Sequence, residues 1–492
     1  MRVLLCSAYF CFLLASAWGG QRSPNILFVY LDDLGYGDVS CYNPESKIQT
    51  PHMDRLAKEG IRFTDAHTPA AICGPSRYGV MTGRYPWRRG KDGLGNGAKF
   101  RDTFIEHGRL TLASLLKKKG YNTAQIGKWG MRHHYSKALK PGAKPGTRDA
   151  YDFPRKRLLG SQRFGFDYSW CMTHLFPLDG EKQISVFCKH QMENGLPVDA
   201  KLKHSNARNW LPDSAKKVVE YIEAYAQKEK VNQFGIQPKH PFFIYWDPPS
   251  PHEPIVPHSR FLGKSGAGAY GDFIVEIDHY LGEVLKALDR HELSENTLVI
   301  LSSDNGPEKS AYSRIKQYQH DSMGGLRGVK RDLWEGGHRV PFILRWPGRI
   351  KAGGTEGGLV CLTDILATFA DITEQALPQD AGEDSISLLP QLYGQTGSKQ
   401  VRSHVIHHSH RGHYALRYGD WLFIDAKTGD VSGEPKWFSK DRGVQHHQHQ
   451  AALYHLKDDK KQSTNLYGSH PEKARQMKQK LNQLKAKPLS RN

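Results

Sequence analysis

The chain has 492 residues, of which 38% are hydrophobic and 24% are charged. This composition excludes a collagen-like chain, a coiled coil, a multi-span membrane protein and a wholly disordered chain, and the length suggests roughly two to four domains. Lys plus Arg exceed Asp plus Glu by 69 − 50 = 19, and 17 − 8 = 9 of that excess lies in residues 401–492. A surplus of this kind favours polyanionic partners such as nucleic acid, anionic lipid or acidic glycan.

The N-terminus has the pattern of a secretory signal peptide. Arg2 precedes an apolar stretch that extends from Val3 to about Leu14, and residues 15–17 (ASA) form an A-x-A cleavage signal. We therefore expect residues 1–20 to be removed and the protein to be exported, to a periplasm or the extracellular space rather than to a lysosome-like compartment. An uncleaved N-terminal anchor is the alternative. No other stretch is apolar enough to cross a bilayer, so stable membrane insertion is not expected.

Strands and helices alternate along residues 24–385. Strands are expected at 26–31, 121–126, 241–247 and 297–302, and helices at 51–60, 112–119, 213–228 and 271–290. This alternation predicts an α/β fold: a mainly parallel central sheet with helices on both faces. Polar residues follow the carboxyl ends of the strands, where open α/β sheets bind ligands.

The alternation lapses into a linker-like segment near residues 374–400. Beyond it, residues 414–427 and 451–459 have the pattern of hairpin strands, and residues 471–484 that of a basic helix. We expect residues 24–385 to form a catalytic domain and residues 400–492 a smaller α+β subdomain with an antiparallel sheet.

Cysteine usage leaves one thiol unpaired. Cys6 and Cys11 belong to the signal segment, and five cysteines remain: Cys41, Cys73, Cys171, Cys188 and Cys361. An odd number in an exported protein means that at least one lacks an internal partner. Cys171 and Cys188 are close enough in sequence to pair, but the sequence does not establish that they do.

The run Cys73-Gly74-Pro75-Ser76-Arg77 carries the strongest chemical signal. Pro75 is suited to the first position of a helix, which would place Cys73 just before an electropositive helix terminus. A thiol there, with Arg77 nearby, would be a nucleophile of lowered pKa. On these residues alone, a buried or disulfide-bonded cysteine is an equal alternative.

Together with Thr82-Gly83-Arg84, this run resembles the signature of type I sulfatases of the alkaline phosphatase superfamily, in which an enzyme converts the cysteine to formylglycine. The resemblance covers most of the chain, and the family members that the chain resembles include bacterial arylsulfatases and carbohydrate sulfatases. Further motifs follow in the family's order at residues 24–26, 32–38, 127–129, 303–307, 326–330, 335–337 and 453–466.

Two acidic pairs supply the hard oxygen ligands that Ca²⁺ or Mg²⁺ prefers. They are Asp32-Asp33 and Asp304-Asn305, each at the end of an expected strand. The resemblance implies that these four residues bind one Ca²⁺ together with the modified Cys73 side chain. For either pair taken alone, turn chemistry is the alternative.

The resemblance also implies the chemistry. The hydrate of formylglycine carries two hydroxyl groups: one attacks sulfur, and deprotonation of the other releases sulfate. Fixed cations must stabilise the charge, so Lys128 and Lys330 are expected to bind sulfate oxygens. His252 is expected to bond the sulfate or protonate the leaving alkoxide, and Arg77 to orient the formylglycine.

One position departs from the family. A histidine usually follows two residues after the motif lysine, but here that position is Gly130. His133 and His134 are candidates to replace it, and the base stays unassigned. Two histidine-rich stretches, at residues 404–413 and 446–449, are expected mainly as solvated or substrate-edge surface, with metal binding as the lesser alternative.

We interpret the chain as a sulfatase that hydrolyses a sulfate monoester, on a sulfated carbohydrate, after activation by a formylglycine-generating maturation enzyme. The basic surplus would attract a sulfated chain. Aromatic side chains would stack on sugars, although core packing is an equal alternative for each of them; they are Tyr168, Trp170, Trp421 and Trp437. The rivals are a phosphodiesterase or phosphonate monoester hydrolase on the same fold and a catalytically silent glycan-binding protein. Nucleic-acid binding fits neither the export signal nor the acidic pairs.

Overall fold

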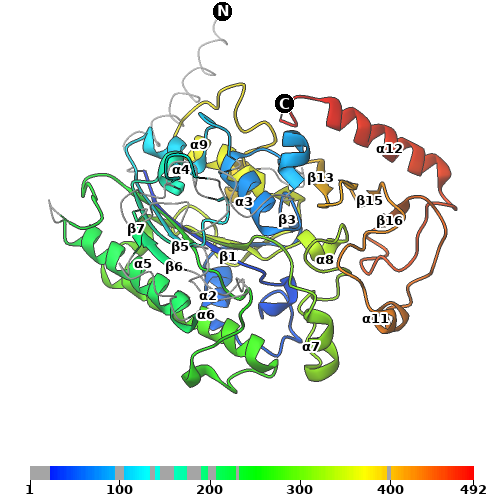
Figure 1. The fold of residues 1–492 in the computed structure, drawn as a ribbon, viewed down its shortest axis with the longest axis horizontal. Coiled ribbons are helices and arrows are strands. Elements are labelled where there is room, and N and C mark those ends of the chain that lie inside the picture. The colour runs from blue at the N-terminus through cyan, green and yellow to red at the C-terminus, as the bar shows by residue number, and fades with distance from the viewer. Residues whose placement is uncertain are drawn as a thin grey trace, which may run out of the picture.

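The computed structural model describes residues 23–94, 103, 105–132, 139–143, 160–173, 190–194, 196–197, 207–228, 232–395 and 401–491. A large sheet lies between two layers of helices, and a smaller sheet lies beside it (Figure 1). The expected signal peptide lies outside the described residues, as does Cys188, so export and the pairing of Cys171 stay predictions.

The large sheet has ten strands in the described part of the chain. Their order is β11-β2-β10-β9-β1-β8-β4-β5-β6-β7. In that order they comprise Gly354–Glu356, Ile61–Phe63, Phe342–Arg345, Thr297–Ser303, Asn25–Leu31, Phe242–Asp247, Asn122–Gly127, Tyr168–Thr173, His190–Glu193 and Leu196–Pro197. Strands β9, β1, β8, β4 and β5 run parallel, whereas β10, β6 and β7 pair antiparallel with their neighbours. The predicted α/β fold with a mainly parallel sheet is confirmed.

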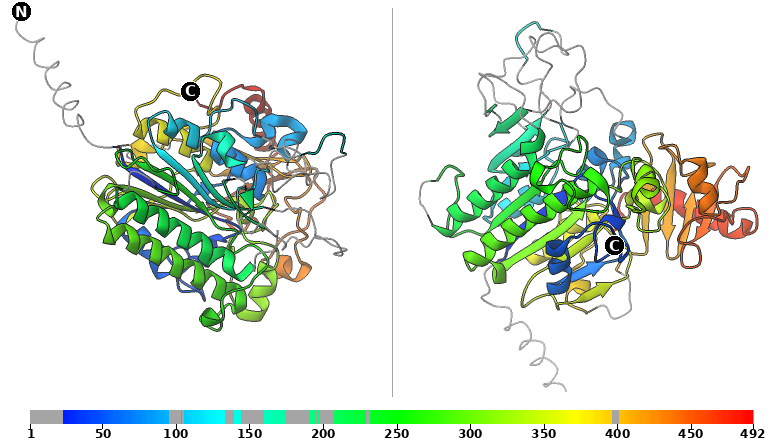
Figure 2. Two further views of the ribbon diagram at one scale, coloured as in Figure 1. Left: turned by 60° about the vertical axis from the view of Figure 1, so that its left-hand side comes forward. Right: turned by 90° about the horizontal axis from the view of Figure 1, so that it is seen from below.

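Helices bury both faces of this sheet. On one face lie α2 (Pro51–Glu59), α5 (Trp210–Ala226) and α6 (Gly268–Arg290), and on the other α3 (Cys73–Thr82), α4 (Leu112–Lys117) and α9 (Ile365–Ile372), as Figures 1 and 2 show. Central strand β1 is therefore apolar throughout rather than alternating, because successive side chains enter different cores. Ile26, Phe28 and Tyr30 pack into one core, and Leu27, Val29 and Leu31 into the other.

The four strands predicted for the main sheet agree with the structure to within one residue at each end. Helix α5 begins at Trp210 rather than at the predicted residue 213. Trp210 and Leu211 are buried in the core, and Pro212 is tolerated because the first turn of a helix has no intrahelical partner for its backbone nitrogen.

The C-terminal residues form the predicted smaller antiparallel sheet, in the order β13-β14-β15-β16. These strands comprise His404–His408, Tyr414–Tyr418, Trp421–Ile424 and Ala452–His455. Helix α12 (Pro471–Ala486) packs across this sheet through a buried stripe that includes Met477 and Leu481 (Figure 1). The boundaries near residues 385 and 400 stay predictions.

Part of the C-terminal basic surplus faces this sheet rather than solvent. The Nζ atoms of Lys473, Lys480 and Lys485 lie 5.1, 5.2 and 3.5 Å from the ring centroids of Trp421, Tyr418 and Tyr414, respectively. Cation–π contacts of this kind hold α12 on the sheet. These lysines therefore stabilise the packing of α12 on the sheet, in addition to any role in attracting a polyanion.

Short elements connect these layers. They are β3 (Ala66–His67) paired with β12 (Val360–Cys361), and the helices α7 (Ala311–Tyr318), α8 (Glu335–His338), α10 (Leu389–Leu392) and α11 (Lys436–Asp441). Within the described ranges, no helix combines the length and the apolar character that crossing a membrane requires.

The surface expectation is wrong for the first half of the first histidine-rich stretch. Residues 404–408 form β13, where His404, His407 and His408 are at most 6% exposed, whereas His413 is exposed as expected. Tyr168 and Trp170 are core residues, the stated alternative to sugar stacking. By contrast, His446 and His449 are exposed as expected.

Candidate active site

The predicted site residues converge at the carboxyl ends of adjacent parallel strands. Strand β1 lies between β8 and β9, and residue 32 donates its backbone N–H to the Ser250 carbonyl at 3.0 Å, just after β8. Asp304 likewise donates to the Leu31 carbonyl at 3.0 Å. Asp33 adopts φ of +70°, a left-handed conformation that ends the alternation of the strand, so both successive carboxylates reach one site.

Cys73 is the first residue of α3 and faces these carboxylates. Its Sγ lies 3.3 Å from Asp32 Oδ1 and 3.9 Å from Asp33 Oδ1. Pro75 is the third helical residue, not the first as predicted. The expected lowered pKa is also wrong, because burial and the carboxylates of Asp304 and Asp32 raise the pKa of the thiol well above its usual value. An unmodified thiol here is held protonated and is a poor nucleophile.

The four predicted oxygen ligands lie together with Cys73. Asn305 Nδ2 donates to Asp33 Oδ1 at 2.7 Å, and the backbone N–H of Asp33 donates to Asp304 Oδ1 at 3.2 Å. The four residues are at most 2% exposed. Within the part of the chain that the structure describes, Asn305 Oδ1 is buried without a hydrogen-bond partner, an orphaned acceptor that a hard cation would satisfy.

Arg77 is fully buried beneath this cluster. Its Nε and Nη2 lie 3.0 and 2.9 Å from Asp304 Oδ2, and its Nη1 donates to the Lys128 carbonyl at 2.9 Å. Nη1 also contacts Asp247 Oδ2 at 3.3 Å. Sequence reasoning missed Asp247, although this residue is the last of a predicted strand. Asp32 and Asp304 likewise lie at the ends of predicted strands. Burial raises the pKa of Asp247 well above its usual range, against the opposing effect of Arg77.

The two predicted sulfate-binding lysines contact the same carboxylates. Lys128 Nζ pairs with Asp32 Oδ2, and Lys330 Nζ lies 2.7 and 2.8 Å from the two oxygens of Asp33. Burial would lower the pKa of each ammonium group, but the carboxylates reverse this and raise it. Both lysines are therefore charged at neutral pH.

His252 follows β8 and completes the ring of polar groups. Its Nδ1 lies 2.8 Å from the Glu253 carbonyl, which fixes the proton on that nitrogen and leaves Nε2 facing the site, 3.8 Å from Asp33 Oδ2. Burial lowers the pKa of His252 below its usual value. The neutral ring accepts a proton at Nε2, and the protonated ring donates one there.

The charges at the site fit a divalent cation. Three carboxylates, of Asp32, Asp33 and Asp304, face three cations, of Lys128, Lys330 and Arg77. Two further carboxylates, of Asp247 and Glu308, lie beside Arg77 and Lys330. Burial and Asp32 raise the pKa of Asp304 to about 7 despite Arg77, as expected where carboxylates are crowded. A bound divalent ion would relieve this crowding and compete with the cations for the carboxylates.

The structure shows what a side chain at position 130 would meet. Gly130 adopts φ of +69°, and a Cβ atom at this position would lie 2.6 Å from Arg77 Cδ. The Arg77 side chain thus occupies the space into which a residue-130 side chain would project. His133 and His134, the candidate replacements, lie outside the described residues, so their role stays a prediction.

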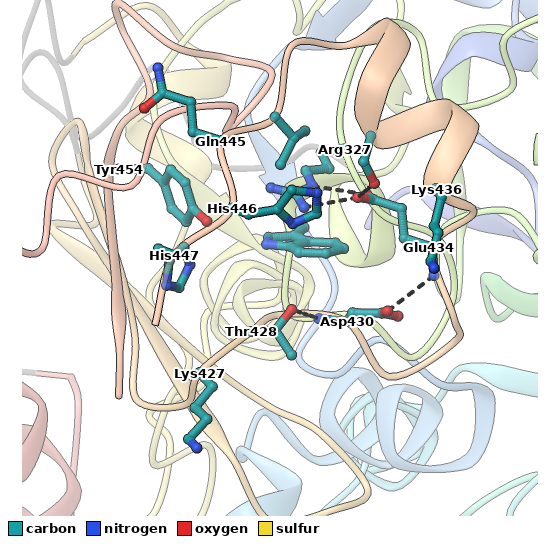
Figure 3. A pocket seen from close by; sticks show the side chains of 13 residues that line it. Arg327, Lys427, Thr428, Asp430, Glu434, Lys436, Gln445, His446, His447 and Tyr454 are labelled. Atoms are coloured by element: carbon teal, nitrogen blue, oxygen red, sulfur yellow. Dashed lines mark hydrogen bonds and ion pairs between the residues drawn. The ribbon is translucent and has the colours of Figure 1, made fainter. Parts of the chain in front are cut away.

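A second cavity, of 240 Å³, lies in the C-terminal subdomain next to the loop that carries Lys330. Arg327 closes one wall by a two-pronged contact with Glu434, at 2.8 Å for each pair of atoms. Figure 3 shows His447 and Tyr454 on the side opposite Glu434. Sequence reasoning missed this cavity, because it combines residues 327–334 with residues 427–454, which are far apart in the chain.

Comparison with known proteins places these observations in a family. The Sulfatase family matches residues 24–375. An N-acetylgalactosamine-6-O-sulfatase of Bacteroides thetaiotaomicron is 33% identical, over 95% of this chain and 94% of its own. Human arylsulfatase A is 31% identical, over 92% and 85%.

Solved structures give the same result. A sulfatase structure from work on the metabolism of multiple glycosaminoglycans by Bacteroides thetaiotaomicron superposes with a TM-score of 0.76 at 28% identity, covering 95% of this chain and all of that one. A sulfatase from Pseudoalteromonas sp. shares the fold, with a TM-score of 0.72 at 23% identity, over 99% and 94% of the two chains.

Proposed function

Because this chain belongs to the sulfatase family and is a sulfuric ester hydrolase, we propose that it removes sulfate from a sulfated carbohydrate, using formylglycine at position 73 and one Ca²⁺. The observation that carries the formylglycine and calcium assignments is the convergence of five residues at one buried point. They are Asp32, Asp33, Asp304, Asn305 and Cys73.

The cofactors would supply chemistry that the genetically encoded side chains lack. The hydrate of formylglycine provides the nucleophilic hydroxyl, and Ca²⁺ would lower its pKa while shielding the carboxylates. Arg77 positions the site indirectly, since it holds Asp304 and the Lys128 backbone in place. A formylglycine-generating maturation enzyme is part of this proposal.

The protein's cations would hold the substrate. Lys128 and Lys330 are paired with the carboxylates that a cation would bind, so a cation there would compete for those oxygens and leave both ammonium groups for the sulfate. His252 Nε2 faces the same space and, when protonated, would donate its proton to the leaving oxygen.

Two observations support a carbohydrate substrate. The bacterial relative named N-acetylgalactosamine-6-O-sulfatase aligns over 95% of this chain, and the C-terminal subdomain supplies a polar cavity beside the Lys330 loop. This cavity is lined by exposed Lys427, Lys436 and His446, groups that suit a further sulfated sugar, and by Asp430 and by Glu434, which is paired with Arg327. Attraction over such a surface is screened within about 10 Å at 0.1 M salt.

The test is desulfation of a panel of sulfated oligosaccharides, beside an aryl sulfate and an aryl phosphate, by protein co-expressed with a maturation enzyme. We expect kcat/KM on a sulfated oligosaccharide to exceed that on the aryl sulfate and to fall more steeply with salt. Lys427→Ala should lower only the oligosaccharide value, whereas exposed Lys460→Ala, outside the cavity lining, should change neither. Equal salt slopes would remove the carbohydrate assignment, and preferential turnover of the phosphate would favour the phosphodiesterase alternative.

A further inference from the structure

Three histidines from distant segments meet where the C-terminal sheet joins the main domain. His67 ends β3, His338 ends α8, and His407 lies in β13. All three are fully buried, and one ring nitrogen from each lies within 4.8 Å of the others. The mechanism described above uses none of them.

Two of these rings bind an acceptor through one nitrogen and face each other through the other nitrogen. His67 Nε2 lies 2.9 Å from Asp65 Oδ1, and His338 Nε2 lies 3.3 Å from the Leu333 carbonyl. Because both partners are acceptors, each Nε2 carries a proton. The two Nδ1 atoms are 3.0 Å apart, so they share either a proton, as a hydrogen bond, or a metal ion.

The third ring lacks any hydrogen bond within the described residues. His407 Nδ1 and Nε2 are both buried without a partner, an arrangement that is unfavourable for each unsatisfied nitrogen. The His407 ring stacks on His338, with centroids 3.5 Å apart and planes at 13°. Because an imidazole lone pair lies in the ring plane, the His407 ring has to rotate out of this stack to direct a nitrogen toward the facing pair.

Charged groups surround the cluster. Arg339 lies 3.2 Å from Asp65 and 3.1 Å from Glu335, and Arg417 lies 3.1 Å from Asp65, so the two carboxylates balance the two guanidinium groups before any ion is added. Among the described residues, Glu335 Oε1 is buried without a hydrogen-bond partner, and Glu335 Oε2 lies 3.8 Å from His67 Nε2.

We propose that His67, His338 and His407 bind one transition-metal ion of the class that imidazole prefers, with Zn²⁺ as the representative. Two nitrogens on a tetrahedral Zn²⁺ lie roughly 3.3 Å apart, given Zn–N bonds of about 2.0–2.1 Å, which matches the facing Nδ1 pair. The contact of His67 with Asp65 is the carboxylate–histidine arrangement that orients metal-binding imidazoles. Such an ion would be distinct from the active-site cation and would fix β13 to β3 and α8.

The experiment is metal analysis of the purified full chain produced with added Zn²⁺, beside three variants: His407→Ala, the size-conserving His407→Gln, and His413→Ala as a control. His413 is exposed in the turn after β13 and lies outside the cluster. The parent and the control should hold one equivalent of zinc more than either His407 variant, at equal calcium content. Removing that zinc with a chelator should lower the melting temperature of the parent but not that of His407→Gln.

Co²⁺ substitution gives a readout that does not depend on the variants folding. Protein produced with Co²⁺ should show the visible absorption of a tetrahedral, nitrogen-bound ion, which His413→Ala retains. A parent that carries no zinc or cobalt beyond that of His407→Gln, or that shows no such spectrum, would overturn the proposal. In that case a shared proton joins the His67 and His338 nitrogens.

Discussion

Replacing Lys330 by methionine tests the charge arrangement of the active site most directly. Lys330 is 2% exposed and contacts both oxygens of Asp33, at 2.7 and 2.8 Å. Methionine keeps much of the volume and removes the charge. Among the described residues, Asp33 then keeps one side-chain donor within 3 Å, the amide of Asn305 at 2.7 Å.

The size of the effect should depend on calcium. Removing one partner of a buried ion pair costs about 3–5 kcal/mol, and the Asn305 contact favours the lower end, so the free energy of unfolding should fall by about 3 kcal/mol without calcium. With calcium bound, Asp33 has a new counter-charge, and the loss should shrink. For turnover, losing one donor to a developing negative charge costs about 2.7–4 kcal/mol, or a 10²–10³-fold fall in kcat.

The assay combines urea unfolding, with and without calcium, and turnover of the preferred sulfate ester. Lys309→Met is the matched control, because Lys309 is exposed and lies in the same region of the chain. We expect the control to behave as the parent does. Turnover of Lys330→Met within tenfold of the parent would refute the sulfate-binding role, and an equal stability loss with and without calcium would refute the placement of the ion at Asp33.

Three further predictions address residues 73, 130 and 304. Peptide mass spectrometry should show a formylglycine mass at Cys73, and Cys73→Ala should be inactive; full activity of the unmodified thiol would contradict this. Gly130→His should lower the free energy of unfolding by about 1–3 kcal/mol and lower turnover, since its Cβ would meet Arg77 at 2.6 Å. The measurement is thermal unfolding, and the control is Gly142→His, because Gly142 is also left-handed but has open space around it. In the metal-free protein the pKa of Asp304 is raised to about 7, so its protonated form stabilises the fold at low pH and this stabilisation is lost as pH rises through 7. Calcium must displace that proton, so calorimetry should show affinity falling about tenfold per pH unit below 7 and levelling above it; a pH-independent Kd between 5.5 and 7.5 would contradict this.

The sequence predicts the central strands well because β1, β8 and β9 are buried on both faces and appear as continuous apolar runs. The edges of the sheet were not predicted: β2 and β11 have three residues each, too few for a periodic pattern. Family motifs located the site residues, and the structure brings them together. The sequence does not indicate Asp247 because this residue matches no motif and contacts the site by way of Arg77.

The histidine cluster shows what a linear pattern does not contain. His67, His338 and His407 are separated by 271 and 69 positions, and none lies near another in the sequence. The stretch at residues 404–413 is predicted mainly as solvated or substrate-edge surface, with metal binding as the lesser alternative, because it lies outside the calcium motifs. Whether an imidazole is buried depends on its partners, and these come from other segments of the chain.

The position of Cys73 at the start of α3 also constrains the order of events in biosynthesis. Ser76 and Arg77, which belong to the run that a maturation enzyme would read, are fully buried beneath the site. Arg77 is paired there with Asp304, which is made more than 200 residues later. The proposed maturation enzyme would therefore meet this run in the extended chain, before the second half of the protein covers it. On this proposal modification would precede folding, and a chain that folded first would keep its unmodified thiol.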